Sequence, residues 1–362
     1  MFALILPLFL LAGLRLHASG ALLLALLAAF NVGGVLSLTP HLDRFEAINF
    51  IAVSVYLAVT AGFFAMLVQD RAGERLDALK RGLVIAGAIA SMAGILGYFN
   101  VAGLGAIFTK YERAAGTFKD PNVLGTFVLL PMVYVAQDIL LRRGPFLRNA
   151  ALFGLIFFGG VFLSFSRGAW GHAIGSLGLM TALTFLLTAN AITRTRIVLL
   201  SIAGLVAAGV ALAGALSVEE VRTMFEQRAS LNQSYDVGET GRFGNQLRSI
   251  PDLLERPNGY GPLQFRNYWP EDPHNVYINA FASYGWLGGL SYALLIILTL
   301  WVGWRTVAAR NLTQNHAIAI WSVLFVQIFQ GFQIDTDHWR HFYLMLGLIW
   351  GLHGLMQRSR SA

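Results

Sequence analysis

"ALLLALLAAFNVGGVLSL", residues 21–38, contains no charged side chain. Two further runs, "IAVSVYLAVTAGFFAMLV" at 51–68 and "SYALLIILTLWVGW" at 291–304, are also free of charge. Apolar runs of about 20 residues are long enough to cross the hydrocarbon core of a bilayer. In lipid every backbone polar group needs a partner within the protein, and a helix supplies one. These runs predict an all-α, polytopic membrane protein.

The composition agrees with a membrane protein, because 56% of the 362 residues are hydrophobic and only 12% are charged. Soluble domains average about 25% charged residues. The absence of cysteine excludes disulfides and thiolate chemistry. "MFALILPLFLLAG" has no basic stretch before its apolar run, so it lacks the pattern of a cleaved signal peptide. About eleven apolar segments (ten to twelve, since the first is short) are expected near residues 2–14, 19–37, 47–69, 83–103, 121–140, 150–165, 168–189, 197–217, 276–304, 316–334 and 342–356.

Every second loop is basic, which is the pattern of cytoplasmic loops in membrane proteins. The net charge of +7 is therefore interpreted as topology rather than as affinity for nucleic acid. The remaining loops face outward, and the largest of them, residues 218–273, contains two amphipathic stretches that we expect to form helices on the outer membrane surface. We expect a single integrated membrane domain, with helices 1–8 in residues 1–217, the helical loop in 218–273 and helices 9–11 in 274–362.

Arg167 is the first candidate for chemistry, since only "SFSRGAW" separates two apolar segments there. A charge so close to hydrocarbon either faces a bundle interior or a wet cavity, or extends to the lipid headgroups. Arg242 is the second candidate. It follows a glycine at the start of an amphipathic stretch, where backbone N–H groups and a guanidinium form an anion site. Most other arginines of this loop share it with nine acidic residues, so we expect them to be solvated or paired.

His274 is the third candidate, because Pro273 precedes it and an apolar helix follows. A neutral imidazole there can accept a proton from a hydroxyl near neutral pH, although an interfacial histidine with a structural hydrogen bond has the same sequence pattern. Asn275 is suited to cap the helix, and Gly285 and Gly288 permit close helix packing.

"DTD" at 335–337, with His338 and His341, contains residue types that bind metals. Nothing else in the sequence completes a ligand set, so we predict no metal and no other cofactor. Walker A, HExxH and Gly-x-Ser-x-Gly motifs are absent from the sequence.

His274-Asn275, nine residues and then Gly285-Trp286-Leu287-Gly288 resemble the His-[Asn/Ser/Gln]-x9-Gly-x-x-Gly signature of bacterial O-antigen ligases. The wider superfamily includes Wzy-type O-antigen and exopolysaccharide polymerases and protein O-oligosaccharyltransferases. Four more segments resemble the family in the same order: "GTFKDPNVLGTFVLLP" (116–131), "FLSFSRGAW" (162–170), "GRFGNQLRSIPDLLERPNGYGPLQF" (241–265) and the closing "IDTDHWRHFYLMLGL" (334–348).

The resemblance implies a GT-C-like glycosyltransferase of the bacterial inner membrane, with its active site facing the periplasm. Its donor would be a glycan on undecaprenyl diphosphate, and the transfer would be inverting and independent of metal. Arg167 and Arg242 match the positions that stabilise the leaving diphosphate, and His274 matches the proposed base. Further motif residues are expected to bind substrate (Asn275, Arg266, Lys119, Asp120, Asn122 and His338) or to shape the backbone (Gly259, Gly261, Gly285 and Gly288).

The leading hypothesis is an O-antigen ligase that joins the glycan to lipid A-core in lipopolysaccharide biosynthesis. The nearest alternative is a polymerase, whose acceptor is a second lipid-linked glycan. A lipid or glycan transporter is the alternative from another class, and a non-catalytic scaffold is the last. Transporters usually show paired broken helices and charges at the midplane, whereas the polar residues here gather at one face. The chain is short for the superfamily and lacks the periplasmic extension of many protein-glycosylating members, which weakens the expectation of a protein acceptor.

Overall fold

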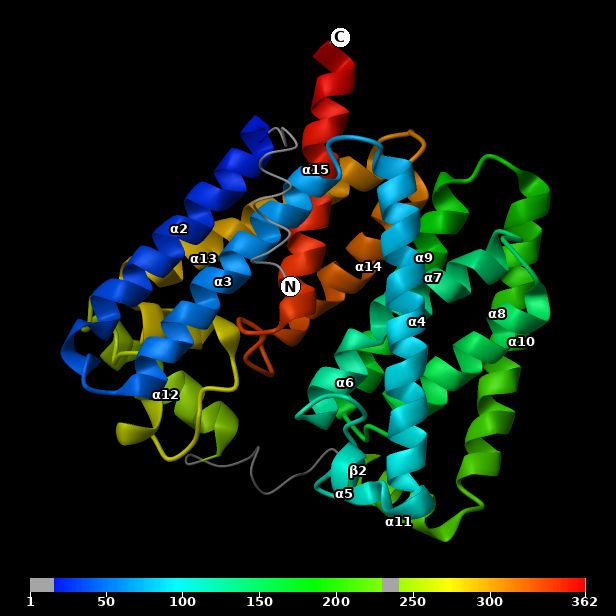
Figure 1. Cartoon of the computed structure of the whole chain (residues 1–362), viewed down its shortest axis with the longest axis horizontal. Helices are drawn as coiled ribbons and strands as arrows, with labels where there is room; N and C mark the ends of the chain where they lie inside the picture. Colours follow the sequence, from blue (N-terminus) through cyan, green and yellow to red (C-terminus); the bar gives the residue numbers. More distant parts are fainter. Residues whose placement is uncertain (1–15, 230–240, 362) are drawn as a thin grey trace. The chain divides into compact units, whose positions relative to one another are not determined.

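The computed structural model describes residues 16–229 and 241–361, so the predicted segment 2–14 and the interpretation of the N-terminus lie outside the described residues. The chain forms two compact units (Figure 1). Unit 1 consists of Met1–Arg75 and Asn232–Ala362, and unit 2 consists of Leu76–Leu231. Each unit is described by itself below.

The chain is a polytopic α-helical membrane protein, as the sequence predicts. Among the described residues, seven helices are long and apolar enough to cross a membrane: Ala18–His41, Phe45–Leu67, Ala72–Tyr98, Pro121–Leu140, Arg167–Leu187, Ala191–Ala215 and Val276–Ala308. The predicted segments 150–165, 316–334 and 342–356 also coincide with helices, which are shorter or more polar. The total of eleven spans stays a prediction.

Unit 1 is built on two pairs of helices that pack closely. α13 (Val276–Ala308) lies along α2 (Ala18–Leu38), and α15 (Arg340–Ser361) lies along α3 (Phe45–Leu67) (Figure 1). Glycines allow the first pair to approach, because a Cβ on Gly33 would lie 2.5 Å from the backbone nitrogen of Gly288. The unit is completed by η1 (Thr39–His41), α12 (Arg242–Leu254), η4 (Phe265–Asn267) and α14 (Gln314–Gln330).

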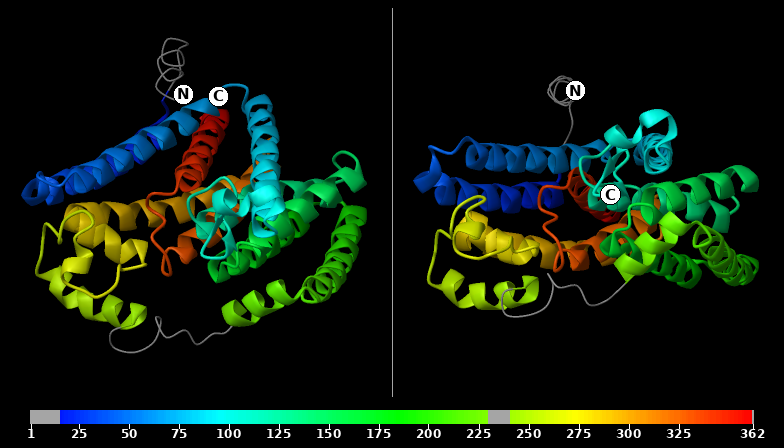
Figure 2. Two further views of the ribbon diagram at one scale, coloured as in Figure 1. Left: turned by 60° about the horizontal axis from the view of Figure 1, so that its bottom comes forward. Right: turned by 90° about the horizontal axis from the view of Figure 1, so that it is seen from below.

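Several connections gather at the end of unit 1 where α13 begins. The backbone nitrogen of Val276 donates to the carbonyl of Gly331, so α14 ends beside the start of α13. α12 and the 255–275 segment lie at the same end (Figure 2). Ser37 at the end of α2 donates to the carbonyl of Asn258 at 2.6 Å, which ties this segment to the bundle.

α12 turns its polar side towards unit 1. Asn245, Gln246 and Ser249 are buried, together with Leu253. The opposite, apolar side is exposed and carries Phe243, Leu247, Ile250 and Leu254. The amphipathic helix expected from the sequence is therefore present, with its apolar side facing away from the protein. Its placement on the membrane surface stays a prediction.

Unit 2 contains most of the remaining helices. The ion pair between Lys80 and Asp138, 2.6 Å long, connects α4 (Ala72–Tyr98) to α7 (Leu129–Leu140). Two short strands, β1 (Thr109–Lys110) and β2 (Arg113–Ala114), pair antiparallel with Thr109 opposite Ala114. The other elements are η2 (Val101–Gly103), α5 (Gly105–Phe108), α6 (Pro121–Phe127), α8 (Phe146–Leu155), the π-helical η3 (Ile156–Phe162), α9 (Arg167–Leu187), α10 (Ala191–Ala215) and α11 (Glu219–Ala229).

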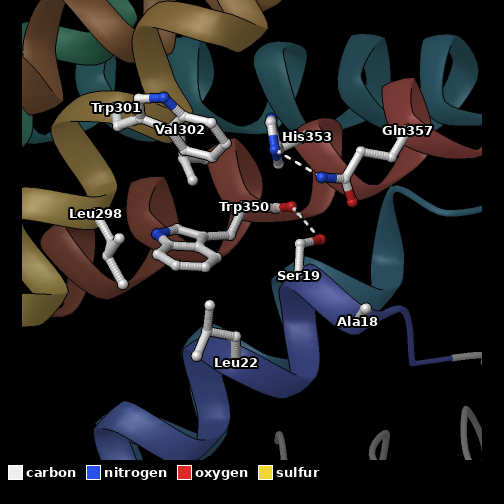
Figure 3. A pocket seen from close by; sticks show the side chains of 9 residues that line it. All are labelled: Ala18, Ser19, Leu22, Leu298, Trp301, Val302, Trp350, His353 and Gln357. Carbon is white, nitrogen blue, oxygen red and sulfur yellow. Dashed lines mark hydrogen bonds between the residues drawn. The ribbon is translucent and has the colours of Figure 1, made fainter.

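A cavity of about 190 Å³ in unit 1 lies between α2, α13 and α15 (Figure 3). Its lining is mostly apolar and includes Leu298, Trp301 and Trp350. None of the residues that line this cavity is among the predicted site residues.

Candidate functional site

His274 and Asn275 form a turn just before α13. His274 has a positive φ of 43°, which is uncommon for a residue other than glycine. Asn275 is the N-cap of α13, and its side-chain oxygen accepts hydrogen bonds from the backbone nitrogens of Tyr277 at 3.0 Å and Ile278 at 3.3 Å. The cap fixes the first turn of the helix and with it the position of the preceding histidine.

Asp335 supports this turn from the loop between α14 and α15. Its Oδ1 accepts a hydrogen bond from the backbone nitrogen of Asn275 at 3.0 Å, and the backbone N–H of His274 also bonds to its carboxyl group. Burial, together with the charges of Asp337 and Asp272, raises the pKa of Asp335 to about 8 against the effect of these two hydrogen bonds. Near neutral pH Asp335 is therefore mainly protonated.

Gln246 connects α12 to the same turn. Its Nε2 donates to the carbonyl of Pro273 at 2.8 Å, and its Oε1 accepts from the Nδ2 of Asn275 at 3.4 Å. α12 begins at Arg242 behind Gly241, as the sequence suggested, while the side chain of Arg242 lies outside the described residues. The backbone of Arg242 thus belongs to the helix that contacts the His274 turn.

A second polar cluster lies deeper along α13. Asp337 is buried and accepts from Asn279 at 3.1 Å, and it lies 3.1 Å from Nδ1 of His338. Nε2 of His338 is 3.0 Å from the carbonyl of Phe50. Burial by itself lowers the pKa of His338, but the charge of Asp337 and these hydrogen bonds raise it by more, so the net shift is upward. Both ring nitrogens of this predicted substrate-binding histidine therefore have partners within the protein.

Gly285 interrupts α13 with backbone angles of φ 65° and ψ −170°. This region is essentially restricted to glycine. A Cβ here would lie 2.6 Å from the carbonyl oxygen of Pro257, and that oxygen accepts a hydrogen bond from the backbone of Trp286 at 2.8 Å. The sequence suggested close helix packing at both motif glycines. Gly288 does pack against α2, whereas Gly285 provides a break in the helix.

The predicted glycines Gly259 and Gly261 lie in the segment that crosses this break. Both have positive φ, 68° and 103°. The backbone nitrogens of Tyr260 and Gly261 donate to the carbonyl of Ala282 at 2.8 and 3.1 Å. The Gly-Tyr-Gly turn is thus attached to α13 one helical turn before Gly285.

In unit 2, Arg113 joins two motif segments, and the sequence analysis did not identify it. It is buried, and its Nε donates to the carbonyl of Ser164 at 2.6 Å while its Nη2 donates to the Oδ1 of Asn122 at 2.9 Å. The sequence signal for Arg113 is an arginine in a loop predicted to face outward, against the positive-inside pattern, and Arg167 was identified by the same signal.

The other predicted residues of unit 2 lie around this connection. Arg167 is half-buried and is the first residue of α9, whose cap Ser166 accepts from the backbone of Ala169 at 3.3 Å. Asp120 caps α6 and accepts from the backbone of Asn122 at 2.8 Å. Lys119 is exposed.

Arg266 belongs to unit 1, where it is exposed and pairs with Asp272 at 2.8 Å. The predicted residues therefore fall into two sets, one with His274 in unit 1 and one with Asn122 and Arg167 in unit 2. Within residues 16–229 and 241–361, no group of three or more His, Cys, Asp or Glu side chains is arranged to hold a metal ion.

The family model described as O-antigen ligase matches residues 152–293. Residues 152–293 form an O-antigen ligase family domain. The resemblance proposed from the motifs is thereby confirmed for this part of the chain. No curated protein shows significant similarity to the sequence.

The O-antigen ligase domain includes Arg167, Arg242, His274 and Asn275, together with the glycines of the signature. Segments 116–131 and 334–348, which supply Asn122 and Asp335, lie outside it. The family implies a membrane enzyme of the ligase or polymerase type that transfers glycans from lipid-linked substrates.

Proposed function

We propose that this protein is an O-antigen ligase of GT-C-like architecture, which transfers a glycan from undecaprenyl diphosphate to a hydroxyl of lipid A-core. The reaction would take place at the periplasmic face of the bacterial inner membrane. The observation that carries the proposal is the His274–Asn275 turn, held by Asp335 and Gln246 within a domain of this family. Hydrogen bonds to Asp335 and Gln246 thus fix the backbone on both sides of His274.

In the proposed reaction, the acceptor oxygen attacks the anomeric carbon on the side opposite the diphosphate. The bond from the acceptor oxygen to this carbon forms while the bond from the carbon to the diphosphate oxygen breaks, which inverts the configuration. His274 accepts the proton of the acceptor hydroxyl, and undecaprenyl diphosphate leaves with the electron pair.

Arg242 and Arg167 are proposed to stabilise the negative charge that develops on the diphosphate. Arg242 stands at the start of α12, where the first backbone N–H groups of the helix favour an anion. Arg167 stands at the start of α9 in the same manner.

The test is transfer in vitro from purified undecaprenyl-diphosphate glycan to lipid A-core. We compare wild type with His274→Ala and Arg242→Ala, and use Arg222→Ala as the control because Arg222 is an outward-loop arginine paired with Glu219. Removal of a catalytic base or of an oxyanion donor costs about 100-fold or more in rate. We therefore expect that loss in the first two variants and near-normal turnover in the control.

The outcomes separate the alternatives. If wild type ignores lipid A-core and instead lengthens the lipid-linked glycan, the protein is a polymerase. If neither reaction occurs, and the protein moves the lipid-linked donor across the bilayer of proteoliposomes, the protein is a transporter. Full transfer by His274→Ala contradicts the role of this histidine with either acceptor.

A further inference from the structure

Two tyrosines stack in the segment of unit 1 that joins α12 to the His274 turn. The rings of Tyr260 and Tyr268 have centroids 4.4 Å apart and planes inclined by 23°. Tyr260 is almost fully buried, whereas Tyr268 is 49% exposed. The motif includes the glycines on either side of Tyr260 but not Tyr268.

The buried tyrosine is held firmly. Its hydroxyl donates to Asp252 at 2.6 Å and accepts from the indole nitrogen of Trp269 at 2.9 Å. Asp252 also accepts from Nε of Arg256 at 3.0 Å. Burial and the bond to Asp252 raise the pKa of Tyr260 to about 12, so the hydroxyl stays protonated and the network persists at physiological pH. Tyr268 therefore rests on a rigid support.

Arg256 lies beside the stack and does not occupy the outer face of Tyr268. Its guanidinium carbon is 4.9 Å from the centroid of Tyr268 and 5.3 Å from that of Tyr260. A cation on the outer face of Tyr268 would lie nearly twice as far from the centroid of Tyr260 as the guanidinium carbon of Arg256 does. The observed distances place the guanidinium at the edge shared by both rings.

A half-exposed aromatic ring with charged groups at its edge suits a sugar. The face of an aromatic ring carries negative charge density, which attracts the C–H groups on one face of a pyranose. The guanidinium of Arg256 and the carboxylate of Asp252, both partly exposed, can bond to the hydroxyl groups around that pyranose. A lipid chain fits less well, because Arg266 and Asp272 are exposed nearby in sequence and form another ion pair.

We propose that the outer face of Tyr268 binds a pyranose ring of the glycan substrate, with Arg256 and Asp252 contacting its hydroxyl groups. This proposal rests on the proposed function. α12 connects the Tyr268 site with the His274 turn, because this helix carries both Asp252, which bonds to Tyr260, and Gln246, which contacts the turn. The sugar bound at Tyr268 is thus a binding contact and takes no part in the transfer step.

The probe is the glycan released by mild acid from the undecaprenyl-diphosphate pool of cells that lack this protein. Its binding to the purified full-length protein is measured by saturation-transfer difference NMR. The variants are Tyr268→Phe, Tyr268→Leu and Tyr268→Ala. Tyr111→Ala is the matched control, since Tyr111 is another exposed tyrosine with a nearby cation, the Lys110 amine at 4.8 Å.

We expect Tyr268→Phe to bind nearly as wild type, because the ring face remains. Tyr268→Leu and Tyr268→Ala should bind roughly tenfold more weakly, about 1.4 kcal/mol, and should raise the KM for the donor while kcat stays the same. The control should bind normally. Tyr268→Leu keeps apolar bulk at the site, so it tests the flat ring even if the alanine variant is unstable.

Normal binding by Tyr268→Leu overturns the proposal, and so does an absence of glycan binding by wild type. If vesicles protect the fluorescence of Tyr268 from an aqueous quencher in the presence of the glycan, Tyr268 inserts into lipid. This outcome also overturns the sugar-binding proposal. Failure of the proposed function gives a different result. In that case the deletion strain accumulates no lipid-linked glycan, and the wild-type protein does not transfer the glycan in vitro.

Discussion

Asp335 offers the sharpest test of how the His274 turn is held. Replacement by asparagine keeps an oxygen that can accept from the backbone nitrogen of Asn275, now 3.0 Å away, and from that of His274. Replacement by alanine removes this acceptor. Because the turn is not helical, with φ 43° at His274, no carbonyl of a preceding helical turn can replace it. The two variants therefore separate the hydrogen bonds from the charge.

The magnitude follows from the number of hydrogen bonds lost. A buried donor left without a partner costs about 1–3 kcal/mol, so Asp335→Ala should lose about 2–4 kcal/mol of unfolding free energy. A displacement of His274 by roughly 1 Å costs about 100-fold in transfer rate. Asp335→Asn should lose less than about 1 kcal/mol near neutral pH and retain most of the activity, since its acceptor oxygen remains.

The pH dependence has a definite sign. The pKa of Asp335 is raised from 3.8 to about 8 in the folded protein, so between these values the folded state keeps a proton that the unfolded state has released. The unfolding free energy then falls as the pH rises through this window. A full proton corresponds to about 1.4 kcal/mol per pH unit. Interaction with Asp337 and Asp272 broadens the titration, so we expect a fall of about 1–3 kcal/mol between roughly pH 5 and 8.

The assay is urea unfolding of the purified protein in detergent, followed by tryptophan fluorescence over this pH range, with transfer measured in parallel. Asp335→Asn should become more stable relative to wild type as the pH rises, because it lacks this proton. Asp43→Asn, at an exposed carboxylate between α2 and α3, is the control and should match wild type. Parallel pH curves for wild type and Asp335→Asn, or equal activity of the alanine and asparagine variants, would refute the reasoning.

Substitutions at three further positions test the framework of the site. Gly285→Ala should lose about 2–4 kcal/mol of unfolding free energy, because its backbone angles strain any other residue and the new Cβ meets the carbonyl of Pro257; unchanged urea unfolding would contradict the helix break. Asn275→Ala should lose about 1 kcal/mol while Asn275→Ser stays near wild type, and equal unfolding midpoints for both would argue against the cap. Arg113→Lys should lower the Tm and the transfer rate, because an ammonium cannot reproduce the fork that joins Ser164 to Asn122; a variant as stable and active as wild type would show that this connection is dispensable.

The sequence by itself determined the class of protein and the location of the motif. Long apolar runs predict membrane helices from local composition alone, and the seven candidate spans agree with them. His274, Asn275 and the two glycines that follow were recognisable because their spacing along one helix is a local property. The conformation of Gly285 was not recognisable from the sequence, since a glycine that permits close packing and one that breaks a helix have the same sequence pattern.

Only the tertiary structure decided which residues support the site. Asp335 is 60 residues from Asn275 and Gln246 is 29 residues away, yet both bond to it, and no periodicity predicts such meetings. The orientation of α12 was equally hidden. Helical spacing shows that Phe243 and Leu247 share one side of α12, but which side is buried depends on the residues that pack against the helix. Here the polar side is buried, and Gln246 on that side donates a hydrogen bond to the His274 turn. A local pattern determines which side chains lie together on a helix, while the partner of each side is set by contacts between residues far apart in the sequence.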